Sequence, residues 1–300
     1  MSATWLNGRL VDEAEAVVSV RDRGFLLGDG LFETMRAYGG RVFALNEHLE
    51  RLRRGAARIG LALPDGVEDA IPQTLAASGL TDAAVRLTVT RGCAEREGGG
   101  LAVAVPSPQS GERVRVRGGA VAGSSAATTV ITVRDYEPLA EWYDRGLRAG
   151  FAPGRLDENR ATAGLKHLGY LEAILALRHA QSCGWDDALF LDTAGHVAEA
   201  TASNVFALVD DMLITPPLTC GVLPGITRAT VLRLAAERGH TVREEPIAPE
   251  TLTRASEAFL TSSLREIVPL VAINGEPIGD GRPGPIARGL VADYREVANT

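Results

Sequence analysis

The chain has 300 residues, of which 45% are hydrophobic and 23% charged, as is typical of a globular protein with room for two domains. A net charge of −7 provides no basic surface for nucleic acid or an anionic membrane, and no apolar run approaches the roughly 20 residues of a membrane helix. Three cysteines and five histidines show neither disulfide nor metal-ligand spacing. We therefore expect a cytoplasmic protein that acts on small molecules and binds no metal.

The first half of the chain combines strand and helix patterns. Asn7-Gly8 between two apolar runs predicts a two-residue hairpin. The apolar period after Asn46 predicts a helix that Asn46 caps. The other elements expected here are strands at residues 30–38, 41–45, 84–90 and 129–133 and a helix at residues 67–77. Residues 98–128, rich in Gly, Ser, Ala and Arg, predict a loop with short strand candidates at residues 101–105 and 114–117.

The second half follows a linker that we place at residues 136–141, between an N-terminal domain (residues 1–135) and a C-terminal domain (residues 142–300). An amphipathic helix is expected immediately after Lys166. The remaining predicted elements are strands at residues 147–152, 187–192, 198–204, 205–209, 212–215, 257–261 and 268–273 and helices at residues 225–238 and at the C-terminus. Because the chain lacks a long run of βαβ units, the predicted fold class is α+β, with two domains.

Lys166 is the only lysine in the chain, whereas arginine occurs 30 times. Arginine replaces lysine wherever a solvated positive charge suffices, but its guanidinium does not deprotonate and cannot act as a nucleophilic amine. An arginine-rich composition also leaves an occasional lysine by chance, so the count alone assigns no role. The motifs around Lys166 make it a candidate catalytic amine.

A pyridoxal phosphate enzyme needs an amine to attach the cofactor, an acid at the pyridine nitrogen, a phosphate cradle and a donor near the ring hydroxyl. Glu199 is the candidate acid, because a carboxylate on a mostly apolar strand is costly unless paired; a surface position on an edge strand is the alternative. Gly225-Ile226-Thr227 at a helix start provides N–H groups for an anion. Arg51 and Ser263 supply further donors, although Arg51 also suits a solvated helix face. Tyr170, one helical turn after Lys166, is either the ring-hydroxyl donor or ordinary core.

Seven segments together resemble the class IV aminotransferase family, and they cover nearly the whole chain. They are Gly28–Glu33, Glu47–Leu52, Leu165–Glu172, Asp187–Asp192, Glu199–Phe206, Leu213–Leu218 and Gly221–Arg228. The resemblance implies a fold-type IV enzyme with a small N-terminal α/β domain and a larger C-terminal domain with a β-barrel-like sheet and flanking helices. It also implies pyridoxal 5'-phosphate bound between the domains, and a homodimer.

The resemblance further implies a role for each matching residue. Lys166 carries the cofactor and moves a proton, Glu199 faces the pyridine nitrogen, and Tyr170 approaches the ring oxygen. The residues implied to hold the phosphate are Arg51, Ile226, Thr227 and Ser263.

Thr34 and Arg96 bear on which reaction is expected within this family. Thr34 matches a position where the lyases carry a threonine implicated in proton transfer, although a β-branched residue also simply suits a strand. Arg96 matches an arginine that binds the substrate carboxylate in the lyases and the D-amino-acid enzymes. These residues favour an aminodeoxychorismate lyase of folate biosynthesis, which releases pyruvate from 4-amino-4-deoxychorismate to give 4-aminobenzoate. The alternatives are a class IV aminotransferase that acts on D-amino acids or branched-chain amino acids with a 2-oxo acid acceptor, which Ser262-Ser263 favours, and a catalytically silent pyridoxal-binding protein.

Overall fold

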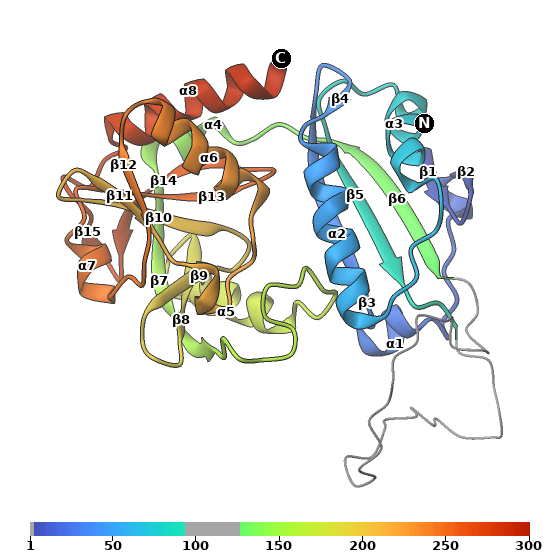
Figure 1. Ribbon diagram of the computed structural model, residues 1–300, viewed down its shortest axis with the longest axis horizontal. Helices are drawn as coiled ribbons and strands as arrows, with labels where there is room; N and C mark the ends of the chain where they lie inside the picture. The colour runs from blue at the N-terminus through green and yellow to red at the C-terminus, as the bar shows by residue number, and fades with distance from the viewer. Residues whose placement is uncertain (1–2, 94–126) are drawn as a thin grey trace, which may run out of the picture.

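The computed structural model describes residues 3–93 and 127–300, which form two β-sheets with helices packed on them (Figure 1). The N-terminal sheet is antiparallel, with the strand order β2-β1-β6-β5-β3-β4. Its strands are β1 (Ala3–Leu6), β2 (Arg9–Asp12), β3 (Gly30–Tyr38), β4 (Arg41–Val42), β5 (Ala83–Thr90) and β6 (Thr128–Asp135). The short helices η1 (Glu13–Glu15) and α1 (Arg23–Leu27) lie between β2 and β3 in the chain.

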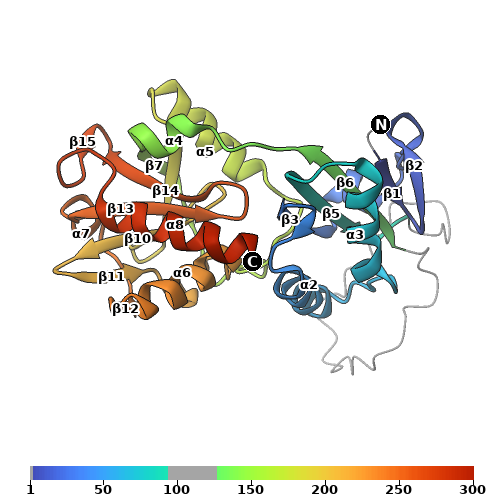
Figure 2. The ribbon, with the colours of Figure 1, turned by 90° about the horizontal axis from the view of Figure 1, so that it is seen from above.

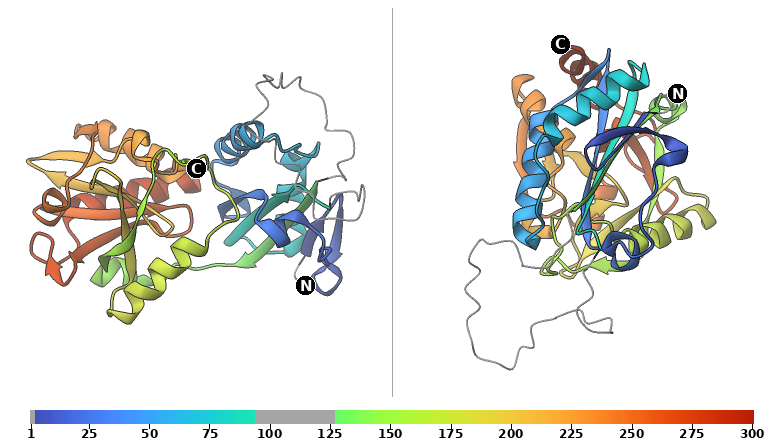
Figure 3. Two further views of the ribbon diagram at one scale, coloured as in Figure 1. Left: turned by 90° about the horizontal axis from the view of Figure 1, so that it is seen from below. Right: turned by 90° about the vertical axis from the view of Figure 1, so that its right-hand side faces the viewer.

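Two longer helices, α2 (Leu45–Ile59) and α3 (Val67–Ser78), pack on the N-terminal sheet (Figures 1 and 3). The apolar residues of α2 recur with a helical period, so that Leu49, Leu52 and Ala56 share one face and join the buried core. Side chains alternate along β3, so Met35 enters the same core while its neighbours in the strand face away from α2. Functional side chains of β3 are therefore presented on two different faces.

The C-terminal sheet closes into a barrel, because β9 pairs with both β8 and β10. The order around the ring is β10-β13-β14-β7-β8-β9, and the pair that closes it is Asn204 with Glu199. The ring strands are β7 (Leu147–Leu156), β8 (Asp187–Asp192), β9 (Val197–Ala200), β10 (Asn204–Val209), β13 (Glu257–Ser262) and β14 (Glu266–Ile273). β11 (Met212–Thr215) and β12 (Thr241–Glu244) extend it from β10, and β15 (Glu276–Pro277) pairs with β14.

Helices flank the barrel on the outside. They are α4 (Ala140–Arg145), α5 (Leu171–Ser182), α6 (Ile226–Glu237), α7 (Pro249–Thr253) and α8 (Pro285–Asn299), with the short helix η2 (Leu218–Cys220) before α6. This is the α+β fold with a barrel-like C-terminal sheet that the resemblance implied, and that prediction is confirmed. No helix within residues 3–93 and 127–300 is long and apolar enough to cross a membrane.

The two halves are joined twice. Residues 136–139 run from β6 to α4 as a single extended segment (Figure 2), and the predicted domain boundary at residues 136–141 stays a prediction. The loop before α5 then returns to the N-terminal sheet, where Phe32 N donates to Lys166 O at 3.0 Å and Leu168 N donates to Gly30 O at 3.1 Å. Through this second contact, Lys166 lies against β3 although it is 134 positions away from Phe32 in the sequence.

Several predicted element boundaries are wrong. α2 begins at Leu45, which was predicted to end a strand. Ala44, with φ of 51°, occupies the N-cap position that was predicted for Asn46. The helix expected directly after Lys166 begins only at Leu171, because the preceding residues form backbone hydrogen bonds with β3. The strand expected at residues 198–204 is two strands with a turn at residues 201–203. The strand candidates at residues 101–105 and 114–117 lie outside the described residues.

Candidate active site

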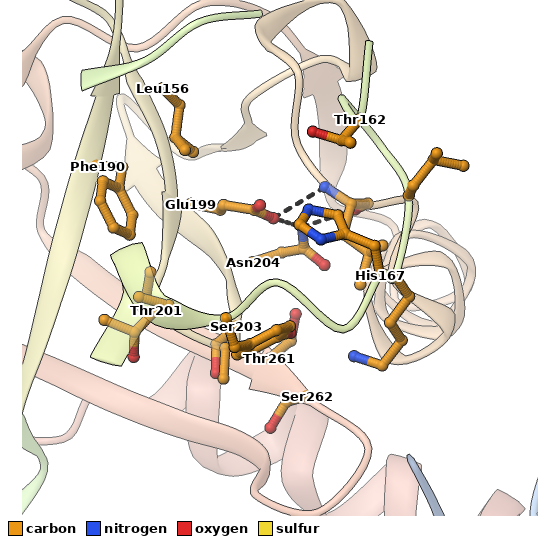
Figure 4. A pocket seen from close by; sticks show the side chains of 18 of the residues that line it. Leu156, Thr162, His167, Phe190, Glu199, Thr201, Ser203, Asn204, Thr261 and Ser262 are labelled. Carbon is orange, nitrogen blue, oxygen red and sulfur yellow. Dashed lines mark hydrogen bonds between the residues drawn. The ribbon is translucent and has the colours of Figure 1, made fainter. Parts of the chain in front are cut away.

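A cavity of about 180 Å³ lies where the loop before α5, the barrel and α2 meet. Residues from both halves of the chain line it, since Arg51 comes from α2 and Glu199 comes from β9 (Figure 4 shows the barrel side). The predicted site residues that line it are Arg51, Lys166, Tyr170, Glu199, Ile226, Thr227 and Ser263. The structure therefore brings together seven side chains that the sequence distributes over 213 positions.

Lys166 contributes a free amine to this cavity. Its Nζ atom lies 4.7 Å from the centre of the Phe32 ring, and no residue in the described part of the chain forms a hydrogen bond or an ion pair with it. Burial, and then the nearby Arg51 guanidinium, lower the pKa of Lys166 to about 8. A larger fraction of the amine is therefore neutral and nucleophilic near neutral pH than in an ordinary lysine.

Glu199 points into the cavity from β9 (Figure 4). Its Oε2 atom accepts hydrogen bonds from the backbone N–H of Leu223 at 2.9 Å and from Nδ2 of Asn204 at 3.5 Å. Burial raises the pKa of Glu199 to about 7, although the Leu223 N–H and nearby cations oppose this shift. β9 is paired on both sides, so the alternative of a surface carboxylate on an edge strand does not apply.

The start of α6 forms a cradle for an anion. Gly225 occupies the N-cap position, and the first backbone N–H groups of the helix, at Ile226 and Thr227, have no partner within the helix. A Cβ atom on Gly225 would collide with Oδ1 of Asn204, so only glycine fits there. Nδ2 of the same Asn204 donates to Leu223 O at 2.9 Å and so fixes the loop that leads into the helix. Asn204 thus links the cradle to Glu199.

Arg51 reaches the cradle from the N-terminal half. Its Nη1 atom donates to Pro224 O at 2.9 Å, and its Nε atom donates to Oε1 of Glu33 at 2.9 Å. Only 7% of Arg51 is exposed, so it is not part of a solvated helix face. His48 also contacts Glu33, with 2.8 Å between Nδ1 and Oε2, and its Nε2 atom lies 3.5 Å from Oγ of Ser263. Sequence reasoning assigned no role to Glu33 or His48, although both lie in its N-terminal motifs.

Arg86, on β5, is a candidate that sequence reasoning missed. Its guanidinium carbon lies 3.9 Å from the centre of the Phe32 ring, the same ring that Lys166 approaches. Phe32 also contacts Tyr170, whose ring centre is 5.2 Å away in an edge-on arrangement. The available signal was the sequence Ala83–Thr90, in which one arginine interrupts an otherwise uncharged strand. Arg86 places a cation suited to a carboxylate against the Phe32 ring that Lys166 also approaches, although it is not among the residues that line the cavity.

Of the two residues that favoured a lyase, Thr34 and Arg96, the structure describes only Thr34. Thr34 pairs with Arg86 across the N-terminal sheet, but it is not among the residues that line the cavity. Arg96 lies outside the described residues.

With this fold and this cavity, the chain matches the family model "Amino-transferase class IV" over residues 30–273. The chain belongs to the class IV aminotransferase family, whose members depend on pyridoxal phosphate. It is 35% identical to a Methanocaldococcus jannaschii protein provisionally named branched-chain-amino-acid aminotransferase, over 98% of this chain and 95% of that one. It is 31% identical to the D-alanine aminotransferase of Bacillus licheniformis, over 95% of this chain and 93% of that one. Among solved structures, the branched-chain aminotransferase of Thermoproteus uzoniensis, with norvaline, aligns with a TM-score of 0.84 and 32% identity, over 100% and 95%.

These comparisons overturn the expected lyase. The similar curated proteins are named branched-chain or D-alanine aminotransferases. A Legionella pneumophila structure provisionally named 4-amino-4-deoxychorismate lyase also matches, at 25% identity and a TM-score of 0.80, which is less similar than the Thermoproteus enzyme. The prediction depended mainly on two single-residue matches, Thr34 and Arg96, and the similarity of the whole chain to proteins named aminotransferases outweighs them. The expected role in folate biosynthesis, which depended on the lyase reaction, is therefore not supported either.

Proposed function

We propose that this protein is an aminotransferase that moves the amino group of an amino acid to a 2-oxo acid. One observation carries the proposal: the amine of Lys166, which forms no hydrogen bond or ion pair with the described residues, shares a cavity with Glu199 and with the start of α6. An amine, an acid and an anion cradle are three of the four groups that pyridoxal phosphate requires of its protein. The names of the similar proteins support amino transfer as the outcome.

The residues of the cavity fit this cofactor. Bound pyridoxal phosphate supplies a carbonyl group that an amine can attack and a ring that accepts an electron pair. Lys166 would be the attachment point, and its Nζ would move the proton of the substrate α-carbon. Glu199 would hold the proton of the ring nitrogen, and Tyr170 would donate to the ring oxygen. Backbone N–H groups and side chains of Arg51, Ile226, Thr227 and Ser263 would hold the phosphate.

Arg86 is proposed to bind the carboxylate of the amino acid. It is the guanidinium that contacts Phe32 beside Lys166, and a carboxylate accepts two parallel hydrogen bonds from such a group. Anchoring the carboxylate near Lys166 orients the α-carbon toward the amine, and such orientation is a large part of catalysis.

The proposed amino donor is a branched-chain amino acid. Two of the similar proteins are named for this substrate class, at 35% and 32% identity, and Leu156 and Phe190 add apolar surface to the cavity. D-Alanine is the second candidate, because the Bacillus enzyme named for it is 31% identical over 95% of this chain.

The test is an amino-transfer assay of the purified protein with pyridoxal phosphate and 2-oxoglutarate. L-Leucine, L-valine, L-isoleucine and D-alanine are supplied separately, and glutamate formation is measured. We expect glutamate from at least one branched-chain donor at a rate that Lys166→Ala abolishes. If D-alanine alone is consumed, the second candidate is correct, and if no donor is consumed, the aminotransferase proposal is wrong.

We also propose a homodimer and a cytoplasmic location. Large apolar side chains are exposed at Val20, Phe25 and Leu171, with 73%, 73% and 67% of their surface accessible. α1 and the loop before α5 adjoin, since Gly28 lies beside the backbone of Gly169, so Phe25 and Leu171 stand on neighbouring segments, which we take as one apolar region. Apolar regions of this kind commonly mark protein interfaces, and a second copy of the chain is the occupant we propose.

A further inference from the structure

Glu33, His48 and Ser263 form a chain of polar contacts beside the cavity. Glu33 and His48 are each 1% exposed. Nδ1 of His48 lies 2.8 Å from Oε2 of Glu33, and Nε2 of His48 lies 3.5 Å from Oγ of Ser263. His48 therefore connects a buried carboxylate on β3 to the hydroxyl group that, under the proposed function, binds the phosphate.

The hydrogen positions in this chain of contacts follow from which atoms can donate. Burial by itself would raise the pKa of Glu33, but hydrogen bonds from Arg51 and His48 lower it to about 2. An ionised carboxylate only accepts, so Nδ1 of His48 carries a hydrogen. Burial lowers the pKa of His48, so the imidazole is neutral near pH 7.5 and Nε2 holds a lone pair. The hydroxyl group of Ser263 therefore donates its hydrogen to Nε2.

This arrangement conflicts with phosphate binding. A phosphate dianion only accepts hydrogen bonds, and Ser263 has a single hydrogen to give. If the hydroxyl group turns to the phosphate, the lone pairs of Oγ and Nε2 face each other in a partly buried place, where an unpaired polar atom is costly. A proton on Nε2 removes the conflict, because Nε2–H donates to Oγ while Oγ–H donates to the phosphate.

We propose that His48 takes up one proton from solvent when a phosphate dianion binds beside Ser263, and so acts as a positioning residue for the Ser263 hydroxyl group. The lone pair of Nε2 forms the new N–H bond, and no other covalent bond changes. The inference rests on the proposed function, because the phosphate is that of the cofactor.

The charges around His48 allow this change. In the part of the chain that the structure describes, the groups that act on the imidazole are Glu33 on β3, Arg51 on α2 and Lys166 on the loop before α5. Glu33 favours the imidazolium form, whereas Arg51 and Lys166 oppose it. A phosphate dianion adds two negative charges to this balance and shifts it toward the imidazolium form.

The test follows His48 directly by two-bond ¹H–¹⁵N nuclear magnetic resonance at pH 7.5, with its signals assigned by comparison with His48→Gln. Pyridoxamine 5'-phosphate is the probe, because it brings the phosphate without attaching to Lys166, and pyridoxamine is the matched ligand without phosphate. We expect a neutral imidazole with hydrogen on Nδ1 in the free protein, an imidazolium with pyridoxamine 5'-phosphate, and no change with pyridoxamine.

Calorimetry supplies a second readout. Binding of pyridoxamine 5'-phosphate is measured in buffers of different ionisation enthalpy, which gives the number of protons taken up. On binding, wild type should take up about one proton more than His48→Gln. Through the pH range where this uptake occurs, the Kd of wild type should therefore rise with pH about tenfold more steeply per pH unit than the Kd of His48→Gln. His179→Gln, an exposed histidine of α5, is the control and should match wild type.

Three results would overturn the inference. His48 that stays neutral with bound pyridoxamine 5'-phosphate, or is already doubly protonated in the free protein, contradicts it while leaving the proposed function intact. Failure of the wild-type protein to bind pyridoxamine 5'-phosphate at all contradicts the proposed function and the inference together.

Discussion

At the residue scale, the amine of Lys166 supports a prediction about the pH dependence of cofactor attachment. Its pKa, lowered to about 8 by burial and by Arg51, means that the neutral amine predominates above pH 8 instead of above pH 10.5. We predict that the rate at which pyridoxal phosphate attaches to the apoenzyme rises about tenfold per pH unit below pH 8 and levels off above it. Rapid-mixing absorbance spectroscopy measures this rate.

A model lysine peptide is the reference, and its attachment rate should continue to rise toward pH 10. Lys166→Arg should attach no cofactor at any pH, because the charge is kept and the nucleophile is lost. A rate for the wild-type protein that still rises steeply above pH 9 would contradict the lowered pKa.

Arg86 supports a second prediction at the residue scale. Arg86→Gln should lower kcat/KM for the amino acid by about 10- to 100-fold, mainly through KM, because a charge-assisted hydrogen bond to the carboxylate is lost. Cofactor absorbance should be unchanged, since Arg86 is not part of the cradle. Arg134→Gln, an exposed arginine on β6, is the matched control and should behave as wild type. Equal kinetics for Arg86→Gln and Arg134→Gln would remove Arg86 from substrate binding.

At the element scale, the carboxylate of Glu33 forms the polar contacts between β3 and α2. Glu33 is the partner of both Arg51 and His48 in a buried position. We predict that Glu33→Gln lowers the free energy of unfolding by about 3–5 kcal/mol, because the Arg51 charge stays buried without its counter-ion. Urea denaturation at pH 7 measures the change. Glu68→Gln breaks an exposed pair with Arg53 and should cost less than about 1 kcal/mol.

The same carboxylate predicts a pH dependence. The pKa of Glu33 is lowered from 4.5 to about 2 by its hydrogen bonds, against the effect of burial. Its contribution to stability is therefore complete above pH 4.5 and is lost as the pH falls toward 2. Glu33→Gln should lack this part of the acid sensitivity, and an unchanged pH profile would argue against an ionised Glu33.

The exposed apolar region at α1 and α5 determines the prediction for the whole molecule. We predict that the wild-type protein has the mass of two chains in sedimentation equilibrium, and that the double variant Phe25→Glu, Leu171→Glu has the mass of one. Placing two carboxylates in the proposed interface leaves charges without partners when the interface forms. Leu139→Glu, at an exposed leucine outside this region, is the control and should remain dimeric. A wild-type monomer at micromolar concentration would exclude the dimer.

The amino-acid sequence by itself determined the family, the fold class and seven of the residues that line the cavity. It did so because the chemistry is carried by short motifs, such as Gly225-Ile226-Thr227 at a helix start, whose local geometry depends mainly on neighbouring residues. The uniqueness of Lys166 was visible in the composition alone.

Only the tertiary structure decided how these residues meet. Lys166 and Tyr170 are not related by a helical turn, because backbone hydrogen bonds to Gly30 and Phe32 hold the intervening loop in place of a helix. Such bonds are formed with residues more than a hundred positions away, and no local sequence window contains them. The roles of Glu33, His48 and Arg86 depend likewise on burial and on contacts across elements, and these exist only once β3, α2 and the barrel have come together.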